Sequence, residues 1–310
     1  MTVALITHPA CLGHDAGPWH PECPDRLRAV LAALEDECFQ PLLRAAAPEA
    51  EEAALLRAHT AAHVRSILAI RPPPGRLAQL DPDTAMCDGS AAAALRAAGG
   101  AVLAVDAVME GWASAAFAAV RPPGHHAEPG RAMGFCLFNN AAVAAHHARA
   151  RWGLRRVAVV DFDVHHGNGT QAMFAADPAL FYASSHQSPC YPGTGRPEER
   201  GCVGNVVNVP LPPGSGGAEF RAAWEGVILP ALESFAPELL IVSAGFDAHK
   251  ADPLAEFRLE TEDFAWVTRE LVELARRHTG GRLVSLLEGG YDLDALAASA
   301  AAHVKELMRG

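Results

Sequence analysis

The sequence has little positive charge, few aromatic residues and no long apolar run. Its 25 basic residues against 36 acidic ones give a formal charge of −11, which repels a phosphate backbone and argues against a nucleic-acid partner. No uninterrupted apolar stretch approaches the ~20 residues that span a bilayer, so we expect no membrane segment. The N-terminus lacks the basic stretch and apolar core of a signal peptide, which predicts a cytoplasmic location.

Cysteines are also few, and their pattern is uninformative. The 7 cysteines are odd in number, widely spaced and never arranged as CxxC, which argues against a disulfide framework or a zinc finger. Apolar residues, in contrast, make up 50% of the chain, enough for a sizeable core. The chain has 310 residues, a length that α/β domains often reach as one unit, so we expect one large α/β domain that covers 1–310.

Short apolar runs alternate with amphipathic patterns along the chain. The helical period predicts helices at 25–37, 90–109, 141–151, 219–235, 261–278 and 293–308. Runs rich in β-branched and large apolar residues predict strands at 3–7, 117–120, 157–160, 180–183, 206–209, 239–242 and 283–287. Strands that alternate with helices favour a mostly parallel sheet with helices on both faces.

Unusual polar segments follow four of the predicted strands. RPPGHHA follows 117–120, DFDVHHGNG follows 157–160, SAGFD follows 239–242 and EGGY follows 283–287. In an open parallel sheet, ligands bind beyond the carboxyl ends of the strands. We therefore expect these segments to converge on one crevice.

The segment from Asp161 to His165 is the strongest candidate for a metal site. In an extended chain, the side chains of Asp161, Asp163 and His165 point to one side. Carboxylate and imidazole donors suit zinc, and Asp247 at another strand end could complete a three-ligand site with an open position for water. The competing interpretation, a carboxylate that only caps the following helix, has more weight for Asp247 than for Asp163.

Two histidines and a tyrosine stand at the other strand ends. His125 and His126 follow a rigid Arg-Pro-Pro-Gly turn that would present both imidazoles. Tyr291 follows two glycines, which permit a close approach of the backbone, although alone it would be a packing aromatic. A second pair, His146 and His147, lies within a helical pattern and is interpreted as ordinary packing.

These motifs resemble those of the histone deacetylase family, in order from Arg121 to Tyr291. They are RPPGHHA, GFCLFNN at 134–140, DFDVHHGNGTQ, SAGFDAHKADPLA and LEGGY, with a weaker match to HPE at 20–22. The resemblance implies the arginase/deacetylase fold, one domain with a mostly parallel sheet of about eight strands and helices on both faces. It also implies an amide hydrolase that removes acetyl or short acyl groups from N-acetyl-lysine-like amines.

The resemblance implies two ion sites. Asp163, His165 and Asp247 match the family's zinc ligands, with Fe²⁺ as an alternative metal. Asp161 and Ser184 match a structural potassium site that would stiffen the ligand loop.

The resemblance also implies catalytic roles. His126 matches a general base, and His125, paired with Asp161, matches a cationic or strongly polarised neighbour. Tyr291 matches the hydrogen-bond donor to the developing oxyanion. Asn168 stands where one branch of the family has a carboxylate, and an amide would orient His126 without stabilising its protonated form.

Positions at the substrate tunnel complete the match. Gly134, Phe135 and Tyr191 match residues that line an acyl-lysine tunnel. The loop 71–80 has no acidic residue, whereas many protein-directed members use an Asp near here to hold the peptide backbone. Leu254 stands where polyamine deacetylases carry Glu, which argues against a substrate with a second cation.

Three other functions stay open. The nearest is hydrolysis of an acetylpolyamine or another small acetylated amine, which is the same chemistry on another substrate. A metal-binding scaffold without turnover is a remote alternative, because both histidines and the tyrosine are present. An arginase-like two-metal hydrolase would need more bridging carboxylates than these motifs supply. The oligomeric state is open.

Overall fold

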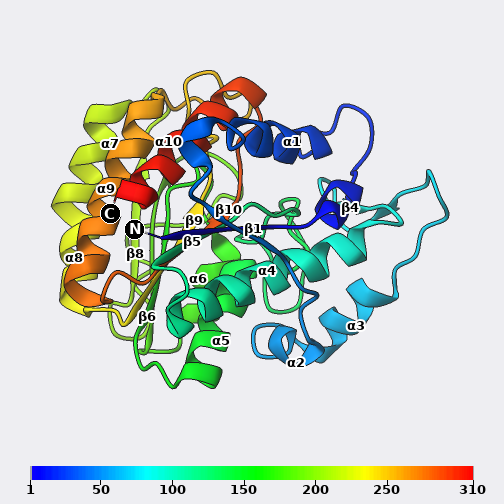
Figure 1. The fold of residues 1–310 in the computed structure, drawn as a ribbon, viewed down its shortest axis with the longest axis horizontal. Helices are drawn as coiled ribbons and strands as arrows, with labels where there is room; N and C mark the ends of the chain where they lie inside the picture. Colours follow the sequence, from blue (N-terminus) through cyan, green and yellow to red (C-terminus); the bar gives the residue numbers. More distant parts are fainter. Residues whose placement is uncertain (1, 310) are drawn as a thin grey trace.

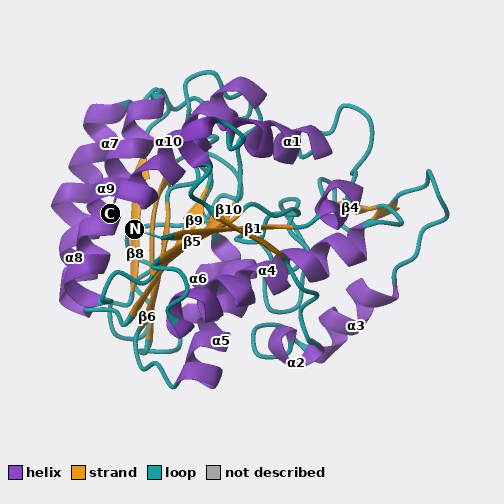
Figure 2. Ribbon diagram, viewed as in Figure 1, coloured by secondary structure: helices purple, strands orange, loops and turns teal. Residues whose placement is uncertain are grey.

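The computed structural model describes residues 2–309 of the chain, and its centre is one parallel sheet. Eight strands form this sheet in the order β2-β1-β5-β10-β9-β6-β7-β8 (Figures 1 and 2). In chain order they are β1 (Val3–Thr7), β2 (Leu43–Ala46), β5 (Ala115–Ala118), β6 (Val157–Asp161), β7 (Leu180–Gln187), β8 (Val206–Leu211), β9 (Leu239–Ala244) and β10 (Leu283–Leu287). β3 (Ala78–Gln79) and β4 (Ala85–Met86) form a separate antiparallel pair.

Helices cover both faces of the sheet, as expected (Figure 1). On one face, α4 packs on β1, β5 and β10, and α5 packs on β6 and β9. α1, α9 and α10 pack on one another over the other face (Figure 1). The helices are α1 (Pro24–Ala33), α2 (Glu52–Leu55), α3 (Ala61–Ala69), α4 (Ser90–Glu110), α5 (Asn140–Trp152), α6 (Asn168–Phe174), α7 (Gly217–Ala223), α8 (Leu229–Phe235), α9 (Thr261–His278) and α10 (Leu293–Arg309).

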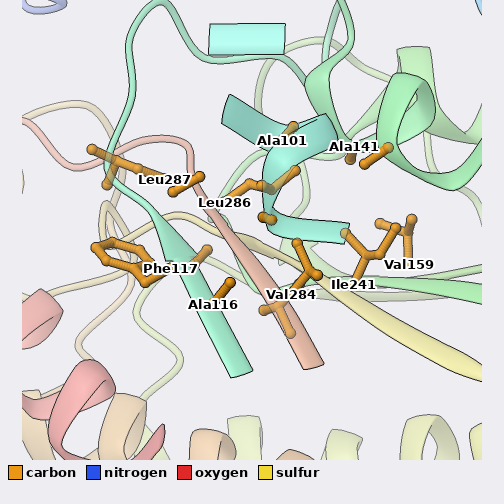
Figure 3. Packing of buried hydrophobic residues seen from close by; sticks show 14 of the residues in the cluster. Ala101, Ala116, Phe117, Ala141, Val159, Ile241, Val284, Leu286 and Leu287 are labelled. Carbon is orange, nitrogen blue, oxygen red and sulfur yellow. The ribbon is translucent and has the colours of Figure 1, made fainter. Parts of the chain in front are cut away.

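Small side chains bring the helices close to the sheet. Ala101 of α4 and Ala141 of α5 lie over the apolar side chains of the central strands, among them Ile241 and Val284 (Figure 3). These residues are almost wholly buried. Because alanine projects only one methyl group, the helix backbone can approach the strands while the interface stays closely packed.

Helix α4 is long and apolar enough, by length and composition alone, to cross a membrane, although Arg96 and Asp106 interrupt its apolar run, as expected. Within the structure, 61% of its most apolar window is buried. The helix packs on β1, β5 and β10 and lies beside α5 on the same face of the sheet. Its composition is therefore explained by burial against the sheet and α5, as in the core helix of a layered α/β fold.

Elements with the clearest apolar patterns agree best with the sequence. β1, β10 and α9 have the predicted bounds. The helix predicted at 219–235 is interrupted, since the turn Trp224–Ile228 adopts π-helical geometry between α7 and α8. The indole nitrogen of buried Trp224 there donates to Ser185 Oγ at 2.9 Å. The helix predicted at 25–37 ends at Ala33 and gives way to a short 3₁₀ turn.

Elements without a clear apolar pattern were not predicted. β2 is a mostly exposed edge strand of sequence LRAA, whose residues have weak strand propensity. α2 and α3 are short, and α6 begins inside the polar segment after β6. β5 starts two residues earlier than predicted because Ala115 and Ala116, buried in the sheet, carry little strand signal.

Candidate metal centre and substrate cavity

The polar segments meet at one edge of the sheet. β5, β10, β9 and β6 are neighbours in the strand order, and all run in the same direction. The four segments that leave their carboxyl ends therefore lie side by side, as the sequence analysis expects. Parallel pairing, rather than proximity in sequence, brings Asp163 and Asp247 together.

Asp163, His165 and Asp247 form a buried cluster of possible ligands. One donor atom from each residue lies within 4.8 Å of the others. His165 Nδ1 lies 3.1 Å from Asp163 Oδ1 and 3.0 Å from Asp247 Oδ2. Among the residues 2–309, this is the cluster of His, Cys, Asp and Glu side chains that could hold a metal ion.

Backbone groups hold the two carboxylates in place. Asp163 Oδ2 accepts a hydrogen bond from Gly289 N at 2.8 Å, and Asp247 Oδ1 accepts one from Val164 N at 2.9 Å. A Cβ on Gly289 would lie 2.2 Å from Asp247 Oδ2, and one on Gly245 would lie 2.1 Å from Asp163 Oδ2. Only glycine fits at either position, so the carboxylates sit in a cradle without side chains.

The electrostatics of this cluster fit a divalent cation. Burial and the neighbouring charge of Asp163 raise the pKa of Asp247 to about 7. Two buried carboxylates this close repel each other unless a positive charge lies between them. One imidazole and two carboxylates also match the donor types and the number of protein ligands that zinc uses at an open site.

His125 lies in a negatively charged region. Its Nδ1 is 3.0 Å from Asp161 Oδ2, and its Nε2 is 3.8 Å from Asp163 Oδ2. Burial acts to lower the pKa of His125, but the carboxylates of Asp163 and Asp161 outweigh it and raise the pKa to about 10. These carboxylates therefore favour the imidazolium form of His125.

His126 stacks at a tilt on His125, with ring centroids 4.0 Å apart, but faces an amide. Its Nδ1 is 2.8 Å from Asn168 Oδ1. Burial, together with the positive charges of His125 and His165, lowers the pKa of His126 well below its usual value. The pKa values of the two imidazoles are thus shifted in opposite directions.

Glu288 fixes the turn that carries both histidines. It accepts hydrogen bonds from Gly124 N at 2.6 Å and His125 N at 3.2 Å, and also from Ser243 Oγ at 3.1 Å. Burial raises its pKa to about 7. The sequence analysis quoted this residue only as part of the EGGY motif, yet its side chain joins three strand ends.

A cavity of about 230 Å³ opens beside this centre. His126 and His165 line it together with aromatic and apolar side chains. Its lining consists of Asp83, His126, Gly134, Phe135, His165, Tyr191, Leu254 and Tyr291. The three residues predicted for the tunnel wall and Leu254, predicted for the rim, are all in this set, so they lie around one cavity with the second histidine and the tyrosine.

Gly134 and Phe135 form a tight turn against His126. Both have positive φ, 56° and 67°, which is uncommon for phenylalanine. A Cβ on Gly134 would lie 2.4 Å from the His126 ring. The glycine therefore allows the backbone to reach the imidazole, and Phe135 then packs edge-on to Tyr291, with centroids 5.9 Å apart.

The histone deacetylase domain matches residues 20–307 of the chain. The chain belongs to the histone deacetylase family. It is 40% identical to the histone deacetylase-like amidohydrolase of Pseudomonas aeruginosa, over 91% of this chain and 79% of that protein. A probable deacetylase of Archaeoglobus fulgidus is 38% identical, over 95% of this chain and 82% of that protein.

A solved structure supports the same fold. The HDA15 HD domain superposes with a TM-score of 0.92 at 38% identity, covering 99% of this chain and 88% of that one. The arginase/deacetylase fold inferred from the motifs is therefore confirmed. Members of the histone deacetylase family act as deacetylases or amidohydrolases, and this chain is an enzyme of that class.

Tyr291, a residue of a family motif, is held by groups from two distant segments. Its backbone N–H donates to Asp252 Oδ2 at 2.7 Å, and the guanidinium of Arg26 lies 4.8 Å from its ring centroid. Arg26 also donates to the carbonyl of Gly290 at 2.5 Å and pairs with buried Glu22 at 3.1 Å. Nothing in the amphipathic pattern of the first helix distinguished Arg26 from a surface arginine.

The residues matched to the family's potassium site are also adjacent. Asp161 of β6 and Ser184 of β7 are paired in register. Asp161 Oδ1 accepts from Asp163 N at 3.1 Å, and Ser184 Oγ lies 2.9 Å from His186 Nδ1. Asp161 thus touches both the His125 region and the loop that carries the metal ligands.

The rim of the cavity carries a carboxylate that the sequence analysis missed. Loop 71–80 is free of acidic residues, but Asp83 just beyond it lines the cavity. Asp83 Oδ1 accepts hydrogen bonds from Gly134 N at 3.0 Å and from Thr84 Oγ1 at 2.6 Å. A carboxylate therefore lines the cavity although loop 71–80 has none, and the DPDT sequence that begins at Asp81 was the available signal.

The remaining histidine pair is outside this site. His147 Nε2 lies 2.7 Å from Asp106 Oδ1 of α4, and the His146 ring packs on Phe174 with centroids 6.2 Å apart. Both contacts join α5 to neighbouring helices. The interpretation of this pair as packing residues agrees with these contacts.

Proposed function

We propose that the protein is a zinc-dependent hydrolase that removes acetyl or short acyl groups from N-acetyl-lysine-like amines. The observation that carries this proposal is the cavity that joins His126, Tyr291 and the buried ligand cluster through His165. A carbonyl carbon that enters this cavity would meet a base, a hydrogen-bond donor and a metal site together.

Asp163, His165 and Asp247 would hold the zinc ion, with Fe²⁺ as an alternative. When bound, the ion would supply Lewis-acid polarisation of the carbonyl and a more acidic water. The two carboxylates would offset much of the ion's charge. A separate base is therefore needed, and the neutral imidazole of His126 meets that need.

Three side chains would divide the proton transfers and charge stabilisation. His126 would accept the proton of the attacking water and later give it to the leaving amine. His125, held cationic by Asp161, would stabilise negative charge next to the reacting carbon. Desolvation raises the pKa of Tyr291 well above its usual value, so its hydroxyl stays protonated and can donate to the oxyanion.

The shape of the cavity supports an alkyl chain as the part of the substrate that enters. Phe135 and Tyr191 contribute aromatic surfaces, and Leu254 adds an apolar group. Asp83 could accept a hydrogen bond from a peptide N–H at the rim. It could equally pair with a second ammonium, so hydrolysis of an acetylpolyamine is the second candidate function.

The test is hydrolysis of matched substrates by the metal-loaded protein. Acetyl-lysine peptides, acetylpolyamines and short acylamides would be compared by kcat/KM, with metal content measured per chain. We expect about one zinc ion per chain and the highest kcat/KM on acetyl-lysine. Absence of hydrolysis on every acylated amine at full metal occupancy would disprove the proposal.

Two further assignments belong to the proposal. A potassium ion at Asp161 and Ser184 would stiffen the ligand loop, which adding and removing K⁺ during thermal unfolding would test. A cytoplasmic location is supported by the seven cysteines, which are all free. Fractionation of the source cells would test the location.

A further inference from the structure

A carboxylate lies one hydrogen bond behind the amide that faces His126. Asn168 Nδ2 donates to Glu128 Oε1 at 3.0 Å, while Asn168 Oδ1 lies 2.8 Å from His126 Nδ1. The three side chains form a line from the rim of the domain to the cavity. Asn168 stands where one branch of the family has a carboxylate, and this arrangement still places a carboxylate, Glu128, behind the amide.

The donor and acceptor types fix the direction of every hydrogen bond in the line. An ionised carboxylate only accepts, so the NH₂ group of Asn168 must face Glu128. Its second hydrogen points to Met133 Sδ, a weak acceptor 3.4 Å away. The carbonyl oxygen of Asn168 is therefore left for His126, and His126 Nδ1 must carry a proton.

This proton on Nδ1 determines which nitrogen can act as a base. In a neutral imidazole only one nitrogen is protonated, so the lone pair is on His126 Nε2. Within residues 2–309, Nε2 has no hydrogen-bond partner, and His126 borders the cavity. If the amide were reversed, its NH₂ would favour a lone pair on Nδ1, and the base would face away from substrate.

Glu128 is itself held in place by its own short loop. Its backbone N–H donates to the carbonyl of Arg131 at 2.9 Å, and its Oε2 lies 3.5 Å from Arg131 Nε. The two oxygens are thus divided, one toward Asn168 and the other toward Arg131. The side chain is 33% exposed, so its contribution comes from directed hydrogen bonding more than from charge.

We infer that Glu128 is a positioning residue, which acts through Asn168 to hold His126 as the Nδ1–H tautomer with Nε2 toward the substrate. This inference rests on the proposed function, in which His126 is the base. Glu128 does not touch the reacting atoms. Its effect should appear in kcat and not in substrate affinity.

The main test replaces Glu128 in three ways. Glu128→Ala removes the acceptor, and we expect kcat to fall about tenfold with KM unchanged, the loss of one orienting hydrogen bond. Glu128→Gln keeps an oxygen acceptor and should retain kcat within about threefold. Arg131→Ala is the matched control, because it breaks the ion pair to Oε2 and leaves the bond from Oε1 to Asn168.

A second readout does not depend on activity. Nitrogen-15 NMR of the zinc-loaded protein reports the tautomer directly, and the His126 signals are assigned by their loss in His126→Ala. We expect a protonated Nδ1 in the parent and in Glu128→Gln, and a mixture of tautomers in Glu128→Ala. Asn168→Ala should resemble Glu128→Ala.

The possible outcomes separate the two ideas. A parental tautomer or a parental kcat in Glu128→Ala overturns the inference, and so does an equal loss in Arg131→Ala, which would mean that Glu128 only secures its loop. A parent inactive on every acylated amine would disprove the proposed function. The tautomer measurement would then decide the inference alone.

Discussion

The regions around His125 and His126 differ sharply in charge, although the two residues are neighbours in the chain. His125 faces the carboxylates of Asp161 and Asp163 at 3.0 Å and 3.8 Å, and its pKa rises to about 10. His126 faces the amide of Asn168, and its pKa falls well below the usual value. The side chains that face each ring, rather than its position in the chain, determine the direction of its pKa shift.

This difference shows how one site can hold two imidazoles with opposite pKa shifts while their ring centroids are 4.0 Å apart. Each state supports the other, because the positive charge on His125 is among the causes that lower the pKa of His126. Pairs of titratable groups with pKa values driven apart are typical of acid–base catalysis. Substitutions inside one region, and others outside both, can therefore separate their contributions.

The largest effect should come from Asp163→Ala, which removes a carboxylate from both the His125 region and the ligand cluster. We expect metal binding and turnover to be lost, because the remaining two ligands provide neither the charge nor the geometry for zinc. Metal analysis and kcat check this. Asn168→Ala, in the His126 region, is the control and should keep its metal. Full occupancy with a parental rate in Asp163→Ala would refute the ligand assignment.

The second effect concerns the opposite wall and leaves both histidine regions unchanged. Tyr291→Phe removes one hydroxyl, and we expect kcat to fall by roughly 10²–10³, as loss of an oxyanion donor does. Metal content should not change, since Tyr291 is outside the ligand cluster. A kcat within about twofold of the parent would exclude Tyr291 from the mechanism.

A third substitution removes one of the two carboxylates that face His125. Asp161→Asn gives His125 an amide partner, and we expect kcat/KM to fall roughly 10–100-fold while metal remains bound. Because His125 is active as a cation, its activity is lost as pH rises through its pKa. Asp161→Asn lowers that pKa from about 10, so the alkaline loss of kcat/KM should begin at a lower pH. If the alkaline loss of kcat/KM occurs at the same pH in Asp161→Asn as in the parent, Asp161 does not control the protonation of His125.

The sequence alone could predict this edge of the sheet because its signals are local. Each polar segment directly follows an apolar strand, and parallel pairing of those strands brings Asp163 to Asp247. The expected roles of these residues came from the resemblance of the motifs to those of the family. Those roles stay predictions until the substitutions are measured.

The parts that could not be predicted depend on contacts across the fold. Arg26 supports Gly290 and Tyr291 from the first helix, over 260 residues away in the chain. Glu128 and Asn168 meet only because the loops after β5 and β6 lie side by side. Edge strand β2 has no apolar pattern, since most of its residues face solvent. No local period in the sequence carries such information.

The smallest effect concerns the rim, where Leu254 and Asp83 line the same cavity mouth with opposite character. Leu254 is 37% exposed, and its backbone donates to Asp252, which also holds Tyr291. A second ammonium beside leucine would lose hydration without gaining a partner. A carboxylate at this partly exposed position would return about 1 kcal/mol, or about a fivefold gain.

We therefore predict that Leu254→Glu raises kcat/KM for acetylpolyamines relative to acetyl-lysine peptides by about fivefold. Leu254→Gln has nearly the same shape without the charge and should leave the ratio unchanged. Added salt should reduce the gain of Leu254→Glu, because partly exposed charges are screened over about 10 Å at 0.1 M ionic strength. If the parent already prefers acetylpolyamines strongly and Leu254→Glu does not change the ratio, Asp83 rather than Leu254 governs the rim. The preference for a lysine-type substrate would then be wrong.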